Sequence, residues 1–227
     1  MRVRCRTSGF PRKASPDTQL RRLLAAHLYV ITADAPPDHV FEVAAAALRG
    51  GADVLQLRHK KLARGELLAL ARRIREITTQ SGALFVVNDH VDIALLSKAD
   101  GVHLGPDDLS IASALRIADG RLLVGASAST PETARAAIVE GADYLGSGPA
   151  FATPIKSEKQ VIGPEGVVAI TAVAGSKVPV FAIGGIDESN IAQVTAAGLW
   201  RACVIRAVAD APDPEQAARR LRAMLTA

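Results

Sequence analysis

Short apolar runs alternate with longer amphipathic segments along most of the chain, beginning at about residue 28. The runs are rich in Val, Ile and Leu, which is typical of parallel strands that are covered on both faces. The segments between them have the length and spacing of helices with one apolar face. Each run and the segment after it therefore predict one strand followed by one helix.

Eight such units follow one another without a linker. The predicted strands are Leu28–Thr32, Val54–Arg58, Leu84–Asn88, Gly101–Leu104, Leu122–Ser127, Tyr144–Ser147, Val180–Ile183 and Ala202–Arg206. The predicted helices lie at about 38–49, 64–81, 91–98, 110–117, 131–140, 163–173, 187–197 and 214–225. An open sheet of five or six strands would leave two units unexplained, so we predict a single (β/α)₈ TIM barrel. An extra helix at about 17–26 is expected to cover its N-terminal mouth.

Local signals mark where several helices begin and end. Thr130-Pro131-Glu132 and Asp213-Pro214-Glu215 each place a capping side chain before a proline at the first helical position. Gly50-Gly51, Gly141 and Gly198 follow helices, and we expect each to adopt the left-handed conformation that ends a helix.

The net charge of +4 belongs to the N-terminus, because residues 1–22 contain seven basic side chains and one acid. We expect residues 1–16 to be a basic extension and residues 17–227 to form the barrel domain. The extension has no aromatic stacking platform and no recognised motif, so no nucleic-acid partner is expected. No apolar run approaches the roughly 18 residues of a membrane span.

Leu23–Ile31 followed by Ala33-Asp34-Ala35 imitates a signal peptide with a cleavage site. Cleavage there would remove the first strand of the barrel, so we reject a secretory role. Cys5 and Cys203 do not form a metal-spaced pair, and a reduced, cytoplasmic setting accounts for both. The sequence is compatible with a homo-oligomer.

In a TIM barrel, chemistry is located where strands end and loops begin. Gln56 and Arg58 share the inward face at the end of the second strand, and Lys60 follows in the loop. A buried cation needs a partner, and the guanidinium fork of arginine suits phosphate oxygens. The alternative is a structural ion pair capped by Gln56.

Carboxylates follow the third and fourth strands. Asp89 comes directly after Asn88, and Asp107-Asp108 follow the fourth strand. Two carboxylates at neighbouring strand ends repel each other unless a cation lies between them, and oxygen ligands suit Mg²⁺. The sequence therefore predicts a magnesium site at Asp89 with Asp107 or Asp108, although Asp108 could also cap the next helix.

The remaining strand ends carry smaller signals. Ser127 could contact a ligand or cap a turn, and Lys156 lies in a long Gly- and Pro-rich loop that is typical of a lid. Gly184-Gly185 ends the seventh strand and Ile205-Arg206 ends the eighth, where many barrels bind phosphate. Two phosphoryl groups are thus expected, one over strands two to four and one over strands seven and eight.

Together these segments resemble the thiamine phosphate synthase family. The matching segments are Gln56-Leu57-Arg58-His59-Lys60, Val87-Asn88-Asp89, Gly101-Val102-His103-Leu104-Gly105-Pro106-Asp107-Asp108-Leu109, Gly125-Ala126-Ser127, Gly141-Ala142-Asp143-Tyr144-Leu145-Gly146-Ser147-Gly148-Pro149 and Ala182-Ile183-Gly184-Gly185-Ile186. The resemblance implies an enzyme that joins a hydroxymethylpyrimidine diphosphate to a thiazole phosphate and releases diphosphate.

The resemblance also implies roles for individual residues. Gln56, Arg58, Lys60 and Asn88 would hold the pyrimidine diphosphate; Asp89 and Asp108 would carry Mg²⁺; Ser127 would contact the reacting diphosphate; Thr153 and Lys156 would close over the substrates; and Gly184, Gly185, Ile205 and Arg206 would hold the thiazole phosphate. Arg58, Ser127 and Lys156 are the catalytic candidates.

Three positions depart from the family pattern. His59 replaces a usual Glu, Ile155 replaces the second Thr of the lid, and Arg206 replaces a usual Ser. Arg206 could contact the thiazole phosphate or point outward. Two alternatives remain: a relative of thiazole tautomerase, which would need a histidine at the position of Ser129, and a non-catalytic protein that binds a phosphorylated ligand.

Overall fold

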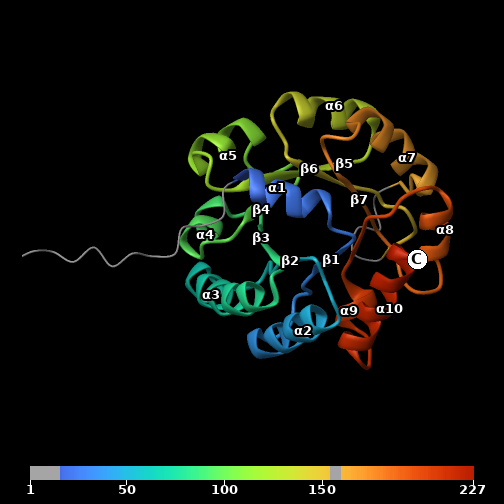
Figure 1. The fold of residues 1–227 in the computed structure, drawn as a ribbon. Coiled ribbons are helices and arrows are strands. Elements are labelled where there is room, and N and C mark those ends of the chain that lie inside the picture. The colour runs from blue at the N-terminus through green and yellow to red at the C-terminus, as the bar shows by residue number, and fades with distance from the viewer. Residues whose placement is uncertain (1–15, 154–159) are drawn as a thin grey trace, which may run out of the picture.

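A computed structural model describes residues 16–153 and 160–227. Its strands pair in parallel, each with the next in sequence, and the eighth pairs with the first to close a barrel (Figure 1). They are β1 (Leu28–Ile31), β2 (Val54–Leu57), β3 (Leu84–Asn88), β4 (Gly101–Leu104), β5 (Leu123–Ala128), β6 (Tyr144–Ser147), β7 (Val180–Ile183) and β8 (Ala202–Val204). The predicted (β/α)₈ barrel is confirmed.

A ring of helices surrounds the barrel (Figure 1). They are α2 (Pro37–Arg49), α3 (Arg64–Ser81), α4 (Val91–Leu96), α5 (Ile111–Ala118), α6 (Pro131–Val139), α7 (Gly163–Ala174), α8 (Ile191–Ala196) and α10 (Pro214–Thr226). Two boundaries differ notably from prediction: α8 begins later than residue 187, and β8 ends at Val204 because Arg206–Ala209 form a short helix, α9. Within the described segments, no helix combines the length and the apolar character that crossing a membrane requires.

The predicted extra helix is α1 (Pro16–Leu24), which lies across one end of the barrel (Figure 1). Leu23 is fully buried in a cluster that also contains Val54, Leu84 and Leu123 from the barrel interior. Gln19 donates a hydrogen bond to buried Asp100 at 2.9 Å. Helix α1 therefore closes the N-terminal mouth, as the sequence predicted.

The predicted helix starts are confirmed, and one predicted helix end is wrong. Thr130 accepts a hydrogen bond from the Thr133 amide, and Asp213 accepts one from the Gln216 amide. The glycines Gly51, Gly141 and Gly198 adopt positive φ as expected. Gly50 instead has φ −72°, and it is required for space, because a Cβ there would lie 2.4 Å from the Glu215 carbonyl oxygen.

Glycines also make room for rings inside the barrel. A Cβ on Gly125 would lie 2.0 Å from the Tyr144 ring, so that ring fills space which a side chain on β5 would occupy. A Cβ on Gly146 would lie 3.3 Å from His103. Both glycines belong to the segments that resemble the family, and the packing of Tyr144 and His103 explains why side chains are absent there.

Three aspartates precede even-numbered strands and tie them to the strand before. Asp53 accepts hydrogen bonds from the His27 and Leu28 amides, Asp100 from the Phe85 amide, and Asp143 from the Val124 amide. All three lie at the N-terminal ends of the strands, where residues of this fold usually contribute to stability and catalytic residues are not found.

Candidate active site at the C-terminal ends of the strands

The loops after β1 and β2 bring basic side chains around one carboxylate. Asp34 Oδ1 accepts a hydrogen bond from the Lys60 amide at 2.8 Å, and its Oδ2 lies 3.8 Å from Arg58. Lys60 Nζ lies 3.7 Å from Asp89 in turn. Arg58 thus has the carboxylate partner that a structural ion pair needs, but the contact is long at 3.8 Å. Two cations, Arg58 and Lys60, therefore lie beside two carboxylates, Asp34 and Asp89, at the mouth of the barrel.

The structure brings Asp89 and Asp108 together at the ends of β3 and β4. Their side chains are in hydrogen-bonding contact. Asp108 Oδ2 also accepts from the Gly105 amide at 2.7 Å, which folds its loop back toward the barrel. The helix-cap alternative for Asp108 is wrong, because Ser110 caps α5.

The environment of Asp89 disfavours a bare carboxylate. Burial and then the contact with Asp108 raise its pKa to about 6, while Lys60 and Arg58 act in the opposite direction. Asp89 also adopts φ 63°, a left-handed conformation that is uncommon outside glycine and asparagine. Strained backbone and a raised carboxyl pKa are both features of functional sites.

The carboxylate pair fits a hard divalent cation that has ligands besides the protein. Among the residues the structure describes, no three or more His, Cys, Asp or Glu side chains gather as a metal site. A cation between Asp89 and Asp108 would relieve their repulsion and would have coordination positions left for phosphate oxygens and water. This is the arrangement that Mg²⁺ usually adopts with a phosphorylated substrate.

Polar groups line the barrel interior beneath this mouth. Buried Gln56 donates to the Tyr29 hydroxyl at 2.8 Å, and that hydroxyl lies 3.0 Å from the Tyr144 hydroxyl. Next to them, His103 Nε2 lies 3.1 Å from Ser127 Oγ. Burial raises the pKa of both tyrosines, so they remain neutral hydrogen-bonding groups.

The structure argues against the capping role that the sequence left open for Ser127. The Ser127 hydroxyl lies beside His103, and Thr130 caps the following helix, so contact of Ser127 with a ligand stays a prediction. The structure also separates Gln56 from Arg58: Gln56 is buried in the floor, whereas Arg58 lies at the rim beside Asp34.

The two glycines after β7 lie against the loop that follows β6. Gly184 has φ 99° and Gly185 has φ 64°. A Cβ on Gly184 would lie 2.6 Å from Pro149, and one on Gly185 would lie 2.5 Å from the Ala152 carbonyl oxygen. The pair therefore joins the β7 end to the first part of the predicted lid.

Arg206 begins α9, directly after Ile205 and the end of β8. Its Nε donates to Asp210 at 2.8 Å, and its side chain is 53% exposed. An exposed ion pair one helical turn long contributes little to stability. Exchanging Asp210 for another anion would therefore cost Arg206 little free energy.

For several predicted site residues the structure gives fewer contacts or none. Asn88 ends β3 opposite His103, and its side chain is partly exposed. Thr153 is the last described residue before a gap at 154–159. The predicted lid residues Ile155 and Lys156 fall in that gap and lie outside the described residues.

Two residues of the site were missed by sequence reasoning. Asp34 was considered only as part of an apparent cleavage site, although it lies in the loop just after β1, where an acidic residue near a strand end is a signal. His103 was overlooked inside Gly101–Leu104, although a histidine in the middle of a buried barrel strand calls for a polar partner.

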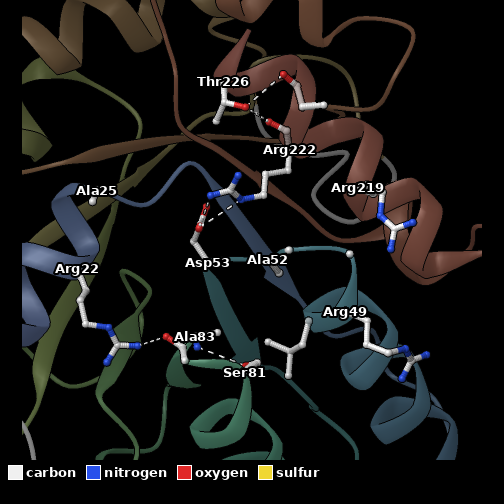
Figure 2. Close-up of a pocket in the computed structure, with 15 residues that line it drawn as sticks. Arg22, Ala25, Arg49, Ala52, Asp53, Ser81, Ala83, Arg219, Arg222 and Thr226 are labelled. Atoms are coloured by element: carbon white, nitrogen blue, oxygen red, sulfur yellow. Dashed lines mark hydrogen bonds and ion pairs between the residues drawn. The ribbon is translucent and has the colours of Figure 1, made fainter.

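A cavity of about 780 Å³ opens at the other end of the barrel, between α1 and the last turns of α2, α3 and α10. Figure 2 shows arginines around it and draws the partners of two of them, Arg22 and Arg222. Arg222 contacts Asp53, Arg49 and Arg219 share Glu215, and Arg22 donates to the Gly82 carbonyl oxygen.

The carbonyl ends of α2, α3 and α10 also face this cavity, and arginine charge complements a helix C-terminus. These arginines therefore hold helices together. The cavity lies far from the strand ends that carry Asp89, Arg58 and Ser127, so we place the chemistry at those strand ends.

A model of the family described as thiamine monophosphate synthase matches residues 28–208. A thiamine-phosphate synthase from Moorella thermoacetica is 47% identical over 186 residues, which cover 82% of this chain and 88% of that protein. One from Gloeobacter violaceus is 45% identical over 193 residues, which cover 85% of this chain. The match spans only 55% of the length of the Gloeobacter protein.

Solved structures agree with the sequence relatives. Thiamine phosphate pyrophosphorylase from Pyrococcus furiosus superposes with a TM-score of 0.82 at 39% identity, covering 91% of this chain and 98% of that one. A 3-hexulose-6-phosphate synthase superposes with a TM-score of 0.65 at 19% identity, a likeness that shows the barrel fold alone.

Proposed function

The chain belongs to the thiamine monophosphate synthase family, and we propose that it joins a hydroxymethylpyrimidine diphosphate to a hydroxyethylthiazole phosphate. The products would be thiamine phosphate and free diphosphate. The bond that breaks joins the pyrimidinylmethyl carbon to the diphosphate oxygen, and the bond that forms joins that carbon to the thiazole nitrogen. Both substrates are small and charged, and we propose a cytoplasmic setting for the reaction.

Diphosphate must be neutralised before it can leave. Arg58 and Lys60 lie at the rim beside Asp34 and Asp89, with side chains that are 20% and 58% exposed. We assign both to the diphosphate, together with Lys156 from the loop after β6. Bringing cations to the leaving group stabilises the charge that develops as the bond breaks.

Asp89 and Asp108 would hold Mg²⁺, which supplies further charge neutralisation on the diphosphate when it is bound. The carboxylate contact and the raised pKa of Asp89 support this assignment. The Asp108 loop is already folded by the Gly105 amide, so that carboxylate is oriented in advance.

The floor of the barrel would receive the pyrimidine ring. Gln56, Tyr29 and Tyr144 form one hydrogen-bonded chain there, and His103 with Ser127 forms another pair. Neutral donors and acceptors of this kind can orient a ring with amino and ring-nitrogen groups without capturing a cation. We assign Gln56 and Ser127 to the ring and its reacting methylene, and Asn88 to the first phosphoryl group.

Departure of diphosphate leaves a pyrimidinylmethyl cation, which the amino-substituted ring stabilises and which water would destroy. We propose that the loop after β6, with Thr153 and Lys156, excludes water. Gly184, Gly185, Ile205 and Arg206 would hold the thiazole phosphate so that the thiazole nitrogen faces the cation. No enzyme nucleophile is required.

The observation that carries the proposal is the contact of Asp89 with Asp108 beside Lys60 and Arg58. The test is to incubate the protein with both phosphorylated substrates, with Mg²⁺ and after chelation, and to measure thiamine phosphate and diphosphate by chromatography. We expect both products in equal amounts, only with the metal. Absence of product at every metal concentration would contradict the proposal.

A further inference from the structure

His59 occupies an unusual place between two residues of the proposed diphosphate site. Its neighbours in sequence are Arg58 and Lys60, whose side chains reach the mouth. His59 itself is only 9% exposed, and its ring nitrogens make hydrogen bonds to backbone groups. Its ring therefore serves the loop and does not contact a substrate.

The imidazole makes three hydrogen bonds, all to backbone groups. Nε2 lies 2.9 Å from the Ala35 carbonyl oxygen in the loop after β1. Nδ1 accepts from the Lys61 amide at 3.3 Å and from the Leu62 amide at 3.2 Å. These partners assign the tautomer: Nδ1 carries the lone pair, Nε2 carries the proton, and the ring is neutral.

The ring connects two loops that are each anchored in the core. Ala35 and Leu62 are partly buried and pack against the main apolar cluster between barrel and helices. Asp34 adds a second link between the same loops, because it accepts from the Lys60 amide. The Lys60 backbone is thus fixed on one side by Asp34 and on the other by the turn that His59 holds.

A glutamate here could accept from the two amides but could not donate to the Ala35 carbonyl oxygen. It would also add a negative charge 3.8 Å or so from Asp34, at the position where Nδ1 now lies. Histidine provides an acceptor and a donor without charge, so it adds no further carboxylate beside Arg58 and Lys60 to compete with an anionic ligand.

We propose that His59 is a positioning residue that bridges the loops after β1 and β2 and so presents Arg58 and Lys60 to the diphosphate. This inference rests on the proposed function. Under this proposal His59 affects the affinity for the pyrimidine diphosphate only. The thiazole phosphate would bind on the other side of the barrel, at β7 and β8.

The test compares His59→Ala and His59→Gln with His39→Ala, an exposed histidine of α2 that serves as control. For His59→Ala we expect KM for the pyrimidine diphosphate to rise about tenfold, as loss of positioning predicts, with KM for the thiazole phosphate unchanged. His59→Gln can place an amide nitrogen where Nε2 lies and so restore the donor to the Ala35 carbonyl oxygen, and we expect it to recover part of the loss. His39→Ala should match the wild type.

Affinity for Mg²⁺ with inorganic diphosphate, measured by calorimetry, gives a second readout that needs no turnover. We expect it to weaken in His59→Ala by about the same factor as KM rises, with partial recovery in His59→Gln. Thermal unfolding checks that both variants are folded.

The outcomes separate this proposal from the function beneath it. A wild-type protein that makes no thiamine phosphate contradicts the proposed function. An active wild type with unchanged diphosphate affinity in folded His59→Ala overturns the role of His59. Equal loss for both substrates, or no recovery by His59→Gln, would also overturn it.

Discussion

The two ends of the barrel use aspartate in opposite ways. At the N-terminal ends of the strands, Asp53, Asp100 and Asp143 accept hydrogen bonds from backbone amides, and the first two also contact arginines. At the C-terminal ends, Asp89 contacts another carboxylate, Asp108, and a lysine at 3.7 Å. The first set is matched by protein donors, whereas the two carboxylates of the second set face each other, and Lys60 relieves their mutual repulsion only in part.

This difference separates stability from chemistry within one fold. Asp100 is 2% exposed, yet its carboxylate is surrounded by three protein donors: the Arg75 guanidinium, the Gln19 amide group and the Phe85 backbone amide. Asp89 is partly buried, and its side chain contacts a like-charged group. A partly buried carboxylate facing another indicates a site for a ligand, whereas a buried carboxylate surrounded by donors indicates structure.

The largest effect is expected from Asp89→Asn. Asparagine tolerates the left-handed backbone at this position, so the fold should persist while the metal loses a charged ligand. We expect kcat/KM to fall by about a thousandfold or more, as for loss of transition-state charge stabilisation. Asp107→Asn, which removes the adjacent carboxylate, is the control and should retain most activity.

Asp100→Asn should instead reduce stability. It removes the charge that Arg75 and the Phe85 amide share at 2.6 and 2.9 Å. Breaking a buried ion pair in this way is expected to cost about 3 kcal/mol in the free energy of unfolding. Urea denaturation measures the loss of stability. The KM values of the folded variant should match those of the wild type. A selective rise in one KM would contradict the proposed division between the two ends of the barrel.

A smaller effect is expected from Arg206→Ala. If Arg206 exchanges Asp210 for the thiazole phosphate, KM for that substrate should rise about tenfold, the cost of one charge-assisted contact, with little change for the other. Steady-state kinetics with each substrate varied in turn measures this. Arg219→Ala is a matched control, because Arg219 also pairs with a carboxylate four residues away and is also 53% exposed, but at the other end of the barrel.

The smallest effect concerns pH and the metal-free protein. Because the pKa of Asp89 is raised to about 6, the native state binds more protons than the unfolded state between about pH 4 and 6. Stability of the metal-free protein should therefore fall as pH rises through this window, by about 1 kcal/mol after solvent screening at the mouth.

Thermal unfolding of wild type and Asp89→Asn across this range tests the sign. Asp89→Asn should be the more stable of the two above pH 6 without metal and should lose this advantage near pH 4. Added Mg²⁺ and diphosphate should stabilise the wild type and not the variant. A wild type whose stability rises over the same window would contradict the pKa assignment.

The barrel could be predicted from sequence because strand and helix patterns repeat eight times and depend on local periodicity. Boundaries failed where tertiary contacts decide them. Gly50 looked like a left-handed helix end, but close packing against α10 requires it. The residues after Val204 continued an apolar run, but they turn into α9 once the strand passes the rim.

The candidate site was predicted in part. Asp89, Asp108, Arg58 and Lys60 could be found because each follows a strand in the chain. Asp34 and His103 could not, because their importance depends on neighbours from other units: Asp34 binds the Lys60 amide, and His103 faces Ser127. Alternation placed Arg58 inward, whereas its side chain reaches the rim carboxylate Asp34.

The most direct test of the division between the two ends is crystallographic. Crystals grown with Mn²⁺ in place of Mg²⁺ and with inorganic diphosphate would locate the metal by its anomalous scattering. The account predicts one peak between Asp89 and Asp108, with diphosphate density reaching Arg58 and Lys60. Metal or diphosphate bound among the arginines at the opposite end, with none at Asp89, would contradict it.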